Sequence, residues 1–158
     1  MTSKTVRLLV RGAAAGAAGT TALNATTYLD MTLRGRPASS TPNRTVEHLA
    51  SHLGIPIPGT AAQRANRISA LGSLGGLLTG VTFGTLLALV RRTGITPGPV
   101  AGGLLASAGA MIGANAPMTA LKITNPRDWS TADWLADAVP HLAYGLTTTW
   151  VLDHLDHQ

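Results

Sequence analysis

Long stretches without charge alternate along the chain with short segments rich in arginine. The clearest uncharged stretch is residues 68–90, and arginines flank it on both sides: Arg64, Arg67, Arg91 and Arg92. A helix rises about 1.5 Å per residue, so a helix over this stretch is about 34 Å long, which is enough to cross the hydrocarbon core of a bilayer. We therefore expect a membrane-spanning helix at residues 68–90.

A second uncharged stretch runs up to Lys122 and predicts a helix at about residues 97–121. Pro97 and Pro99 stand at its start, where a missing amide hydrogen costs a helix little. Only residues 91–94 separate the two uncharged stretches. Because this connection is so short, we expect the two helices to form a tight antiparallel hairpin.

The N-terminal stretch, residues 12–30, has no charge before Asp30 but is only weakly hydrophobic. Basic residues precede it, as they do in a cleaved signal peptide or a transit peptide. Arg11, however, interrupts the apolar core that a signal peptide needs, and serines are scarce for a transit peptide. We favour a retained membrane helix that its neighbours stabilise.

The fourth stretch is residues 130–152. Ser130 and Asp133 have the spacing of a capping box, which marks the start of a helix. Tryptophans stand near both ends, as at the two interfaces of a bilayer: Trp129, Trp134 and Trp150. Two ionisable residues make this stretch the least apolar of the four, so a helix lying on the membrane surface is the alternative.

The long connection, residues 32–67, holds four prolines and predicts mostly irregular structure with one short helix at residues 45–53. We expect it to lie against the membrane or the helix ends. The predicted fold class is therefore all-α, a polytopic membrane helix bundle with four transmembrane helices and one long extramembrane loop that carries a short helix. A single membrane domain covers residues 1–158, with both termini on one side and the long loop on the other.

Composition supports a membrane location and excludes several function classes. Only 12% of the residues are charged, about half the usual fraction of soluble proteins. The net charge is +5, but the basic residues cluster between the uncharged stretches, so we expect no nucleic-acid binding. The absence of cysteine excludes disulfides and thiolate chemistry. Many arginines and few lysines suggest a bacterium of high GC content, and we expect a multi-pass protein of its inner membrane.

Small residues predict how the helices pack. A four-residue repeat of glycines runs along the second stretch: Gly72, Gly76, Gly80 and Gly84. Such a repeat makes a groove in which another helix backbone can approach closely. The third stretch answers with alanines and with Gly102, Gly109 and Gly113, and the first has Gly12, Gly16 and Thr20. We expect packing within one chain, with a homo-oligomer through the second stretch as the alternative.

Four polar residues are predicted to share one depth near the long-loop side, with a fifth, His141, one turn deeper: Asn24, Ser73, Asn115 and Asp137. Asp137 and His141 are four residues apart and face the same way on a helix. One interpretation is a polar intramembrane site for a proton, ion or small solute, with these two residues as the exchangeable pair. The other, which we favour, is hydrogen bonding between helices, typically below about 2 kcal/mol per contact.

No pattern of residues predicts catalysis, a cofactor or a metal. His48 and His52 have a spacing that can hold a metal, but a solvated helix face explains them better, and the order of residues is not that of a zinc hydrolase. No Ser-His-Asp set, phosphate-binding loop or pair of carboxylates stands out. We expect no enzymatic activity.

Three segments resemble small four-helix membrane proteins of high-GC bacteria, a group without an assigned activity: residues 34–42, 46–53 and 140–145. The resemblance implies a membrane location and leaves the function open. We therefore expect a structural or accessory subunit that packs through small-residue helix faces. A small proton, ion or solute transporter is the alternative. The expected partners are the lipid bilayer and either a homo-oligomer or a larger membrane complex.

Overall fold

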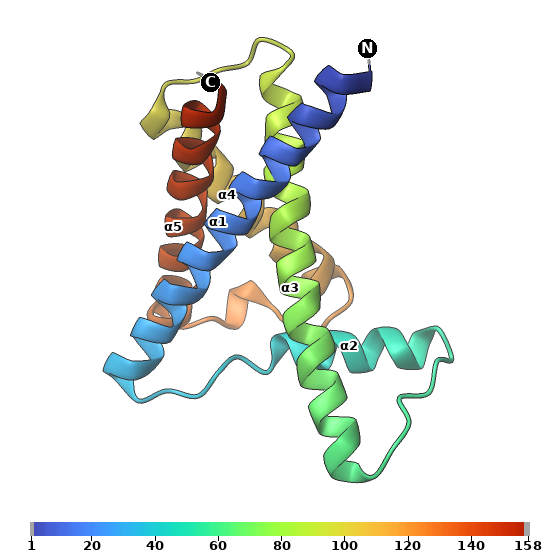
Figure 1. Ribbon diagram of the computed structural model, residues 1–158. Helices are drawn as coiled ribbons and strands as arrows, with labels where there is room; N and C mark the ends of the chain where they lie inside the picture. Colours follow the sequence, from blue (N-terminus) through green and yellow to red (C-terminus); the bar gives the residue numbers. More distant parts are fainter. Residues whose placement is uncertain (1, 157–158) are drawn as a thin grey trace.

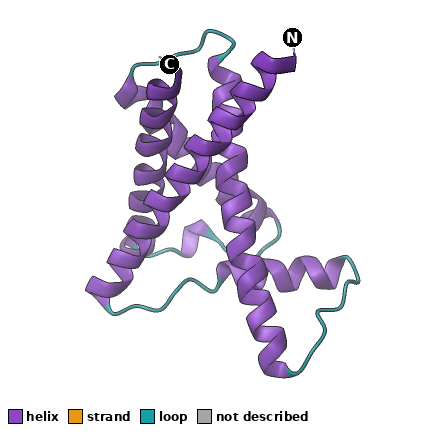
Figure 2. Cartoon of the chain, in the orientation of Figure 1, coloured by secondary structure: helices purple, strands orange, loops and turns teal. Residues whose placement is uncertain are grey.

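The computed structural model describes residues 2–156, and over this range the chain is helical, without strands (Figures 1 and 2). The all-α prediction is confirmed. The elements follow one another as α1 (Thr2–Arg34), α2 (Thr41–His52), α3 (Ala61–Arg91), α4 (Pro99–Ala120), the short 3₁₀ helix η1 (Pro126–Asp128) and α5 (Thr131–Asp156).

The long helices extend beyond the uncharged stretches that predicted them. α1 begins at Thr2 because nothing in its basic first turns breaks a helix, and it ends before Gly35, which takes a positive φ of 61°. α3 begins at Ala61, where the Thr60 side chain accepts a hydrogen bond from the backbone of Gln63 and the Gln63 side chain accepts one from Thr60. Hydropathy therefore predicted the apolar middle of each helix and not its polar ends.

α1 crosses between α3 and α5, and α4 packs on the other side of α5 (Figure 1). The start of α1 and the end of α5 lie at one end of the bundle, together with the connection from α3 to α4. The short helix α2 lies across α3 at the opposite end, as the sequence predicted for the long connection. Its start touches α3, where Pro42 and Asn43 pack against Gly72.

The predicted tight hairpin of α3 and α4 is wrong. The two helices touch at few points, one of which is the ring of Phe83 on α3 against Gly113 on α4. Residues 92–98 carry the chain from α3 to α4, which lies beside α5. The prediction failed because a short connection fixes which ends of two helices meet, while side chains farther along decide which helices pack.

Most buried side chains are small or polar, with a few large exceptions such as Leu152, and most large apolar side chains face outward. Ala15 and Ala88 are buried, and so are the hydroxyl-bearing Thr148 and Thr149. Large aliphatic side chains are widely exposed on the outer faces, for example Leu33, Leu78, Val100 and Leu105. Soluble domains bury their large apolar residues preferentially, so this distribution is unusual for a chain surrounded by water.

By length and composition alone, α3 is the one helix within residues 2–156 that is long and apolar enough to cross a membrane. The other long helices are rich in alanine, glycine and threonine, whose side chains are less apolar than those of leucine and isoleucine. The structure therefore supports one membrane span on this criterion, whereas the sequence predicted four.

Candidate functional site

Three of the five predicted polar residues meet between α4 and α5. The side-chain amide of Asn115 on α4 donates a hydrogen bond to Oδ2 of Asp137 on α5, at 2.7 Å. The Nδ1 atom of His141, one turn later, lies 3.4 Å from Oδ1 of the same carboxylate. The side chains of Asp137 and His141 are largely covered, with 24% and 13% of their surface exposed. We call these three residues the polar triad.

The surroundings of His141 fix its tautomer. Its Nδ1 atom lies 2.8 Å from the backbone oxygen of Asp137 and also near the carboxylate of that residue. A carbonyl and an ionised carboxylate both accept hydrogen bonds and do not donate them. The proton of a neutral imidazole is therefore on Nδ1, which leaves Nε2 as the nitrogen that can take up a second proton.

Both helices carry a proline close to the polar triad. Pro117 lies inside α4, two residues after Asn115, and Pro140 lies inside α5 beside His141. A proline inside a helix removes one backbone hydrogen bond and leaves the carbonyl one turn earlier without its usual donor. The backbone oxygens of Gly113 and Ala136 therefore add hydrogen-bond acceptors near the triad.

The other two predicted polar residues do not join the triad. Ser73 is exposed on α3, and its hydroxyl donates to the backbone oxygen of Ser69 at 3.0 Å, within its own helix. Asn24 is half-buried on α1, and its side chain makes no hydrogen bond to the triad. The sequence therefore predicted the pair on α5 and its neighbour on α4, while Asn24 and Ser73 make no hydrogen bond to them.

The glycines of α3 meet different neighbours along its length. Gly84 lies directly against Gly16 of α1, and Gly80 lies against Thr20 one turn farther along α1. Gly72 contacts α2, and no other atom comes near the place where a Cβ of Gly76 would lie. The close approach of backbones is thus a crossing point of α1 and α3, not a seam along the whole of α3.

Two glycines near the start of α4 face α5, whereas the sequence suggested that the glycines of α4 would answer those of α3. Gly102 lies against Thr149, and the neighbouring Gly103 lies against Leu146. Gly145 of α5 in turn approaches Ser107 of α4. Farther along α4, Gly109 faces open space and Gly113 receives Phe83 of α3, as described above.

Tyr144 is a buried polar residue that sequence analysis missed. Its side chain is on α5, and its hydroxyl donates to the backbone oxygen of Gly80 on α3 at 2.7 Å. Gly19 of α1 lies against the tyrosine ring, so one side chain links three helices. The available signal was the position of a tyrosine in the middle of an apolar helix, where its hydroxyl needs a partner.

An ionic cluster ties three helices together at the end that holds the termini. Arg91 at the end of α3 pairs with Asp153 and Asp156 of α5, and Arg11 of α1 lies 3.7 Å from Asp156. Only 11% of the Arg91 side chain is exposed. The sequence analysis treated these arginines as flanking charges only, because nothing in the sequence places the chain's last helical turn beside them.

At the other end of α1, Asp30 pairs with Arg34, the last residue of the helix, and with Arg36 just beyond it. Oδ2 of Asp30 lies 2.5 Å from Nε of Arg36, and Oδ1 lies 3.4 Å from a guanidinium nitrogen of Arg34. The hydrogen bond from Arg36 is the main cause that lowers the pKa of Asp30 below its ordinary value of 3.8, and the nearby charge of Arg34 lowers it further.

Within residues 2–156, no group of three metal-binding side chains comes together. The rings of His48 and His52 on α2 are nearly parallel, with centroids 6.3 Å apart. The carboxylate of Glu47, the residue before His48, pairs instead with the guanidinium of Arg64 on α3, at 2.9 Å.

Comparisons of the chain with protein-family models, with curated proteins and with solved structures give no match. The fold and the polar triad therefore define the class of this protein only as an all-helical bundle with a small-residue interior. The resemblance to small four-helix membrane proteins of bacteria stays an expectation from the sequence.

Proposed function

We propose that this chain is a multi-pass membrane protein in which α1, α3, α4 and α5 cross the bilayer, and that it serves as a structural or accessory subunit of a membrane assembly. The observation that carries the proposal is the inverted distribution of side chains. Alanines, glycines and threonines make up most of the interior, with a few large exceptions such as Leu152, while most leucines, isoleucines and valines are exposed or only partly covered. Lipid tails or apolar partner helices would cover such a surface, whereas water would not.

The weak hydropathy of α1, α4 and α5 is compatible with this proposal. A helix that packs through glycine and alanine presents its neighbours with backbone, so its few large side chains are free to face lipid. Close backbone contact between α1 and α3, and between α4 and α5, supplies the van der Waals packing that holds helices together in a bilayer. An assembly of such helices can therefore be stable although single spans partition weakly.

Two apolar faces are open for a partner. On α3, Leu78 is 67% exposed one turn from the open Gly75, and on α4, Leu105 is 64% exposed one turn from the open Gly109. A small residue beside exposed leucines suits a helix that approaches closely. These faces support the accessory-subunit role, with a second copy or a different membrane protein as the partner.

Photo-cross-linking in native membranes tests this role. A photoreactive amino acid at position 78 or 105 should give a discrete protein adduct, while the same probe at Leu33, exposed at the end of α1, should give none. Adducts to lipid alone from both helix faces would overturn the accessory-subunit proposal and would leave the membrane location intact.

The polar triad favours one other function, a small transporter of protons, ions or solutes. Its imidazole and its carboxylate are two adjacent ionisable groups, and the carboxylate lies between α4 and α5. Against this stands the position of Ser73 and Asn24 away from the triad, which leaves no continuous polar path from it across the bundle.

Flux of protons or of K⁺ into proteoliposomes distinguishes a transporter from an accessory subunit, and we expect no flux above that of empty liposomes. Wild-type flux that Asp137→Asn and His141→Ala both abolish would establish transport instead.

A further inference from the structure

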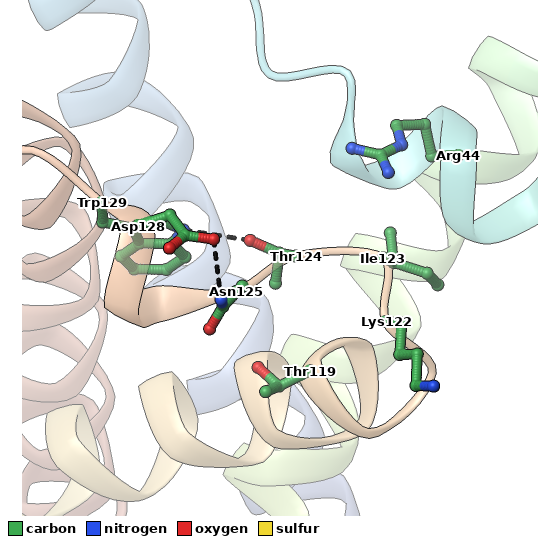
Figure 3. A pocket seen from close by; sticks show the side chains of 8 residues that line it. All are labelled: Arg44, Thr119, Lys122, Ile123, Thr124, Asn125, Asp128 and Trp129. Atoms are coloured by element: carbon green, nitrogen blue, oxygen red, sulfur yellow. Dashed lines mark hydrogen bonds between the residues drawn. The ribbon is translucent and has the colours of Figure 1, made fainter.

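A shallow hollow of about 510 Å³ lies between α2, the end of α4 and the connection that leads to α5 (Figure 3). Arg44 reaches over it from α2, and Lys122 stands at its rim just after α4. The hydroxyls of Thr119 and Thr124 and the indole ring of Trp129 complete its walls. The hollow therefore brings cations and hydrogen-bonding groups from three segments of the chain to one place.

The charge of the hollow is not balanced. Within residues 2–156, neither Arg44 nor Lys122 forms an ion pair, although five other arginines do. One carboxylate, that of Asp128, also lines the hollow, and it accepts a hydrogen bond from Asn125 at 2.7 Å. Two cations against one carboxylate leave one net positive charge. An anion at this place would be attracted by two unpaired cations. It would be repelled by one carboxylate, which already accepts a hydrogen bond from Asn125.

The backbone beside the hollow is held in an uncommon conformation. Lys122 has a φ of 57°, and it is the one residue other than glycine with a positive φ within residues 2–156. The next side chain, Ile123, is buried, so the chain is anchored directly after the turn. Lys122 directly follows the C-cap of α4, and a left-handed residue at this position is a common way for a helix to end.

Aromatic residues place the hollow at one particular level of the bundle. The indole nitrogen of Trp129 donates to the hydroxyl of Thr124 at 3.0 Å, and its ring meets that of Trp134 edge to face. α2 lies across α3 at this same end, and none of the residues of α2 is fully buried. Tryptophans and helices of this kind are typical of the headgroup region of a bilayer.

We propose that this hollow binds the phosphate of an anionic phospholipid headgroup, through the guanidinium of Arg44 and the ammonium of Lys122. The proposal rests on the proposed membrane location, because that location is what brings a lipid phosphate to the hollow. A lipid headgroup and free inorganic phosphate share the chemistry that the hollow would recognise, a phosphate group with one or two negative charges. Arg44 binds it with a planar pair of N–H donors, Lys122 binds it as a point charge, and the hydroxyl of Thr124, which accepts from Trp129, can donate to its oxygens.

Trp129 gives the proposal a local probe. In a chain with Trp134→Phe and Trp150→Phe, Trp129 is the one tryptophan left. The full chain is reconstituted in phosphatidylcholine bilayers that contain increasing fractions of brominated phosphatidylglycerol or of brominated phosphatidylcholine, and bromine quenches tryptophan fluorescence on contact. We expect the anionic lipid to quench at much lower mole fractions than the zwitterionic one. Arg44→Gln and Lys122→Gln should each reduce that preference about fivefold, since one basic residue near a membrane surface raises the affinity for anionic lipid by about that factor.

Arg92→Gln is the matched control, because Arg92 is an exposed arginine at the opposite end of the bundle, and it should leave the preference unchanged. Equal quenching by the two lipids, or a preference that survives Arg44→Gln together with Lys122→Gln, would overturn the proposal. Reversal of the quenching by millimolar inorganic phosphate would mean that a free phosphate occupies the hollow in place of a lipid. Absence of quenching by either lipid would overturn both the headgroup site and the proposed membrane location, whereas quenching without preference would overturn the site alone.

Discussion

The side chains of Asn115 and Asp137 join α4 to α5 through a hydrogen bond of 2.7 Å that lies partly buried between the two helices. Because α4 has few contacts with α3, its attachment to the rest of the bundle depends on α5. This hydrogen bond and the contact between Gly103 and Leu146 lie at different levels of the same interface. Together they fix the position of α4 along α5.

A double-mutant cycle measures the contribution of that hydrogen bond. We expect Asn115→Ala and Asp137→Ala to be coupled by about 1 kcal/mol in the free energy of unfolding in detergent, the size found for hydrogen bonds between membrane helices. The control pair is Ser73→Ala with Asp137→Ala, whose effects should add, since Ser73 bonds within α3. Additive effects in both cycles would show that the carboxylate and the amide do not interact.

The crossing of α1 and α3 predicts opposite effects for two glycines on one helix. A Cβ at position 84 would collide with backbone atoms of Gly16, which cannot move alone, so Gly84→Ala should destabilise the fold by about 1–3 kcal/mol. Gly76→Ala adds its methyl group to open space and should stabilise α3 by up to about 1 kcal/mol. Thermal unfolding in one detergent compares the two, and equal destabilisation would contradict the observed crossing point.

Adjacent arginines at the end of α3 should differ in their effect on stability. Arg91 is largely buried between two aspartates of α5, whereas Arg92 is exposed. Arg91→Gln leaves Asp153 without its cation and Asp156 with Arg11 alone, and should cost about 2 kcal/mol, while Arg92→Gln should change the free energy of unfolding by less than about 0.5 kcal/mol. The comparison uses chemical denaturation of each variant at neutral pH. Similar stability of the two variants would mean that the ionic cluster does not hold α3 to α5.

The pairing of Asp30 with Arg36 predicts a pH dependence of stability. The pKa of Asp30 is lower in the folded chain than its ordinary value of 3.8, so the pair stabilises the fold above that pH, and the stabilisation is lost as the pH falls through the lowered pKa. Arg36→Gln should therefore reduce the thermal midpoint at pH 7, and its effect should shrink as the pH falls below 3.8. Arg34→Gln should have a smaller effect at pH 7, because the hydrogen bond from Arg36 is the main cause of the shift. A difference between wild type and Arg36→Gln that does not change with pH would refute this role.

Sequence reasoning located the helices because hydropathy and capping residues act locally. The uncharged stretch at residues 68–90 and the pair Ser130 and Asp133 predicted α3 and α5, and in the structure the Asp133 carboxylate accepts from the backbone and the hydroxyl of Ser130. The four-residue spacing of Asp137 and His141 likewise predicted their contact, which one helix determines by itself.

Contacts between helices were harder to predict, because a glycine specifies close approach and not the partner. The repeat on α3 indicated a groove, but the helix that enters it is α1, and only at Gly80 and Gly84. Tyr144 and Arg91 find their partners on other helices, and those partners depend on how the bundle is assembled. Periodicity on one helix carries no information of that kind.

The central claim, that four helices cross the bilayer and leave both termini on one side, has a direct test. The chain has no cysteine, so Ser3→Cys, Ile55→Cys and His154→Cys each introduce a single label site in an exposed position near one end of the bundle. Position 154 is labelled in preference to position 156, because a substitution of Asp156 would remove its ion pairs with Arg11 and Arg91. The measurement is labelling by a membrane-impermeant maleimide in sealed vesicles, before and after permeabilisation. We predict that positions 3 and 154 are labelled from the same side and position 55 from the other; labelling of positions 3 and 154 from opposite sides, or of all three sites from one side, would contradict the claim.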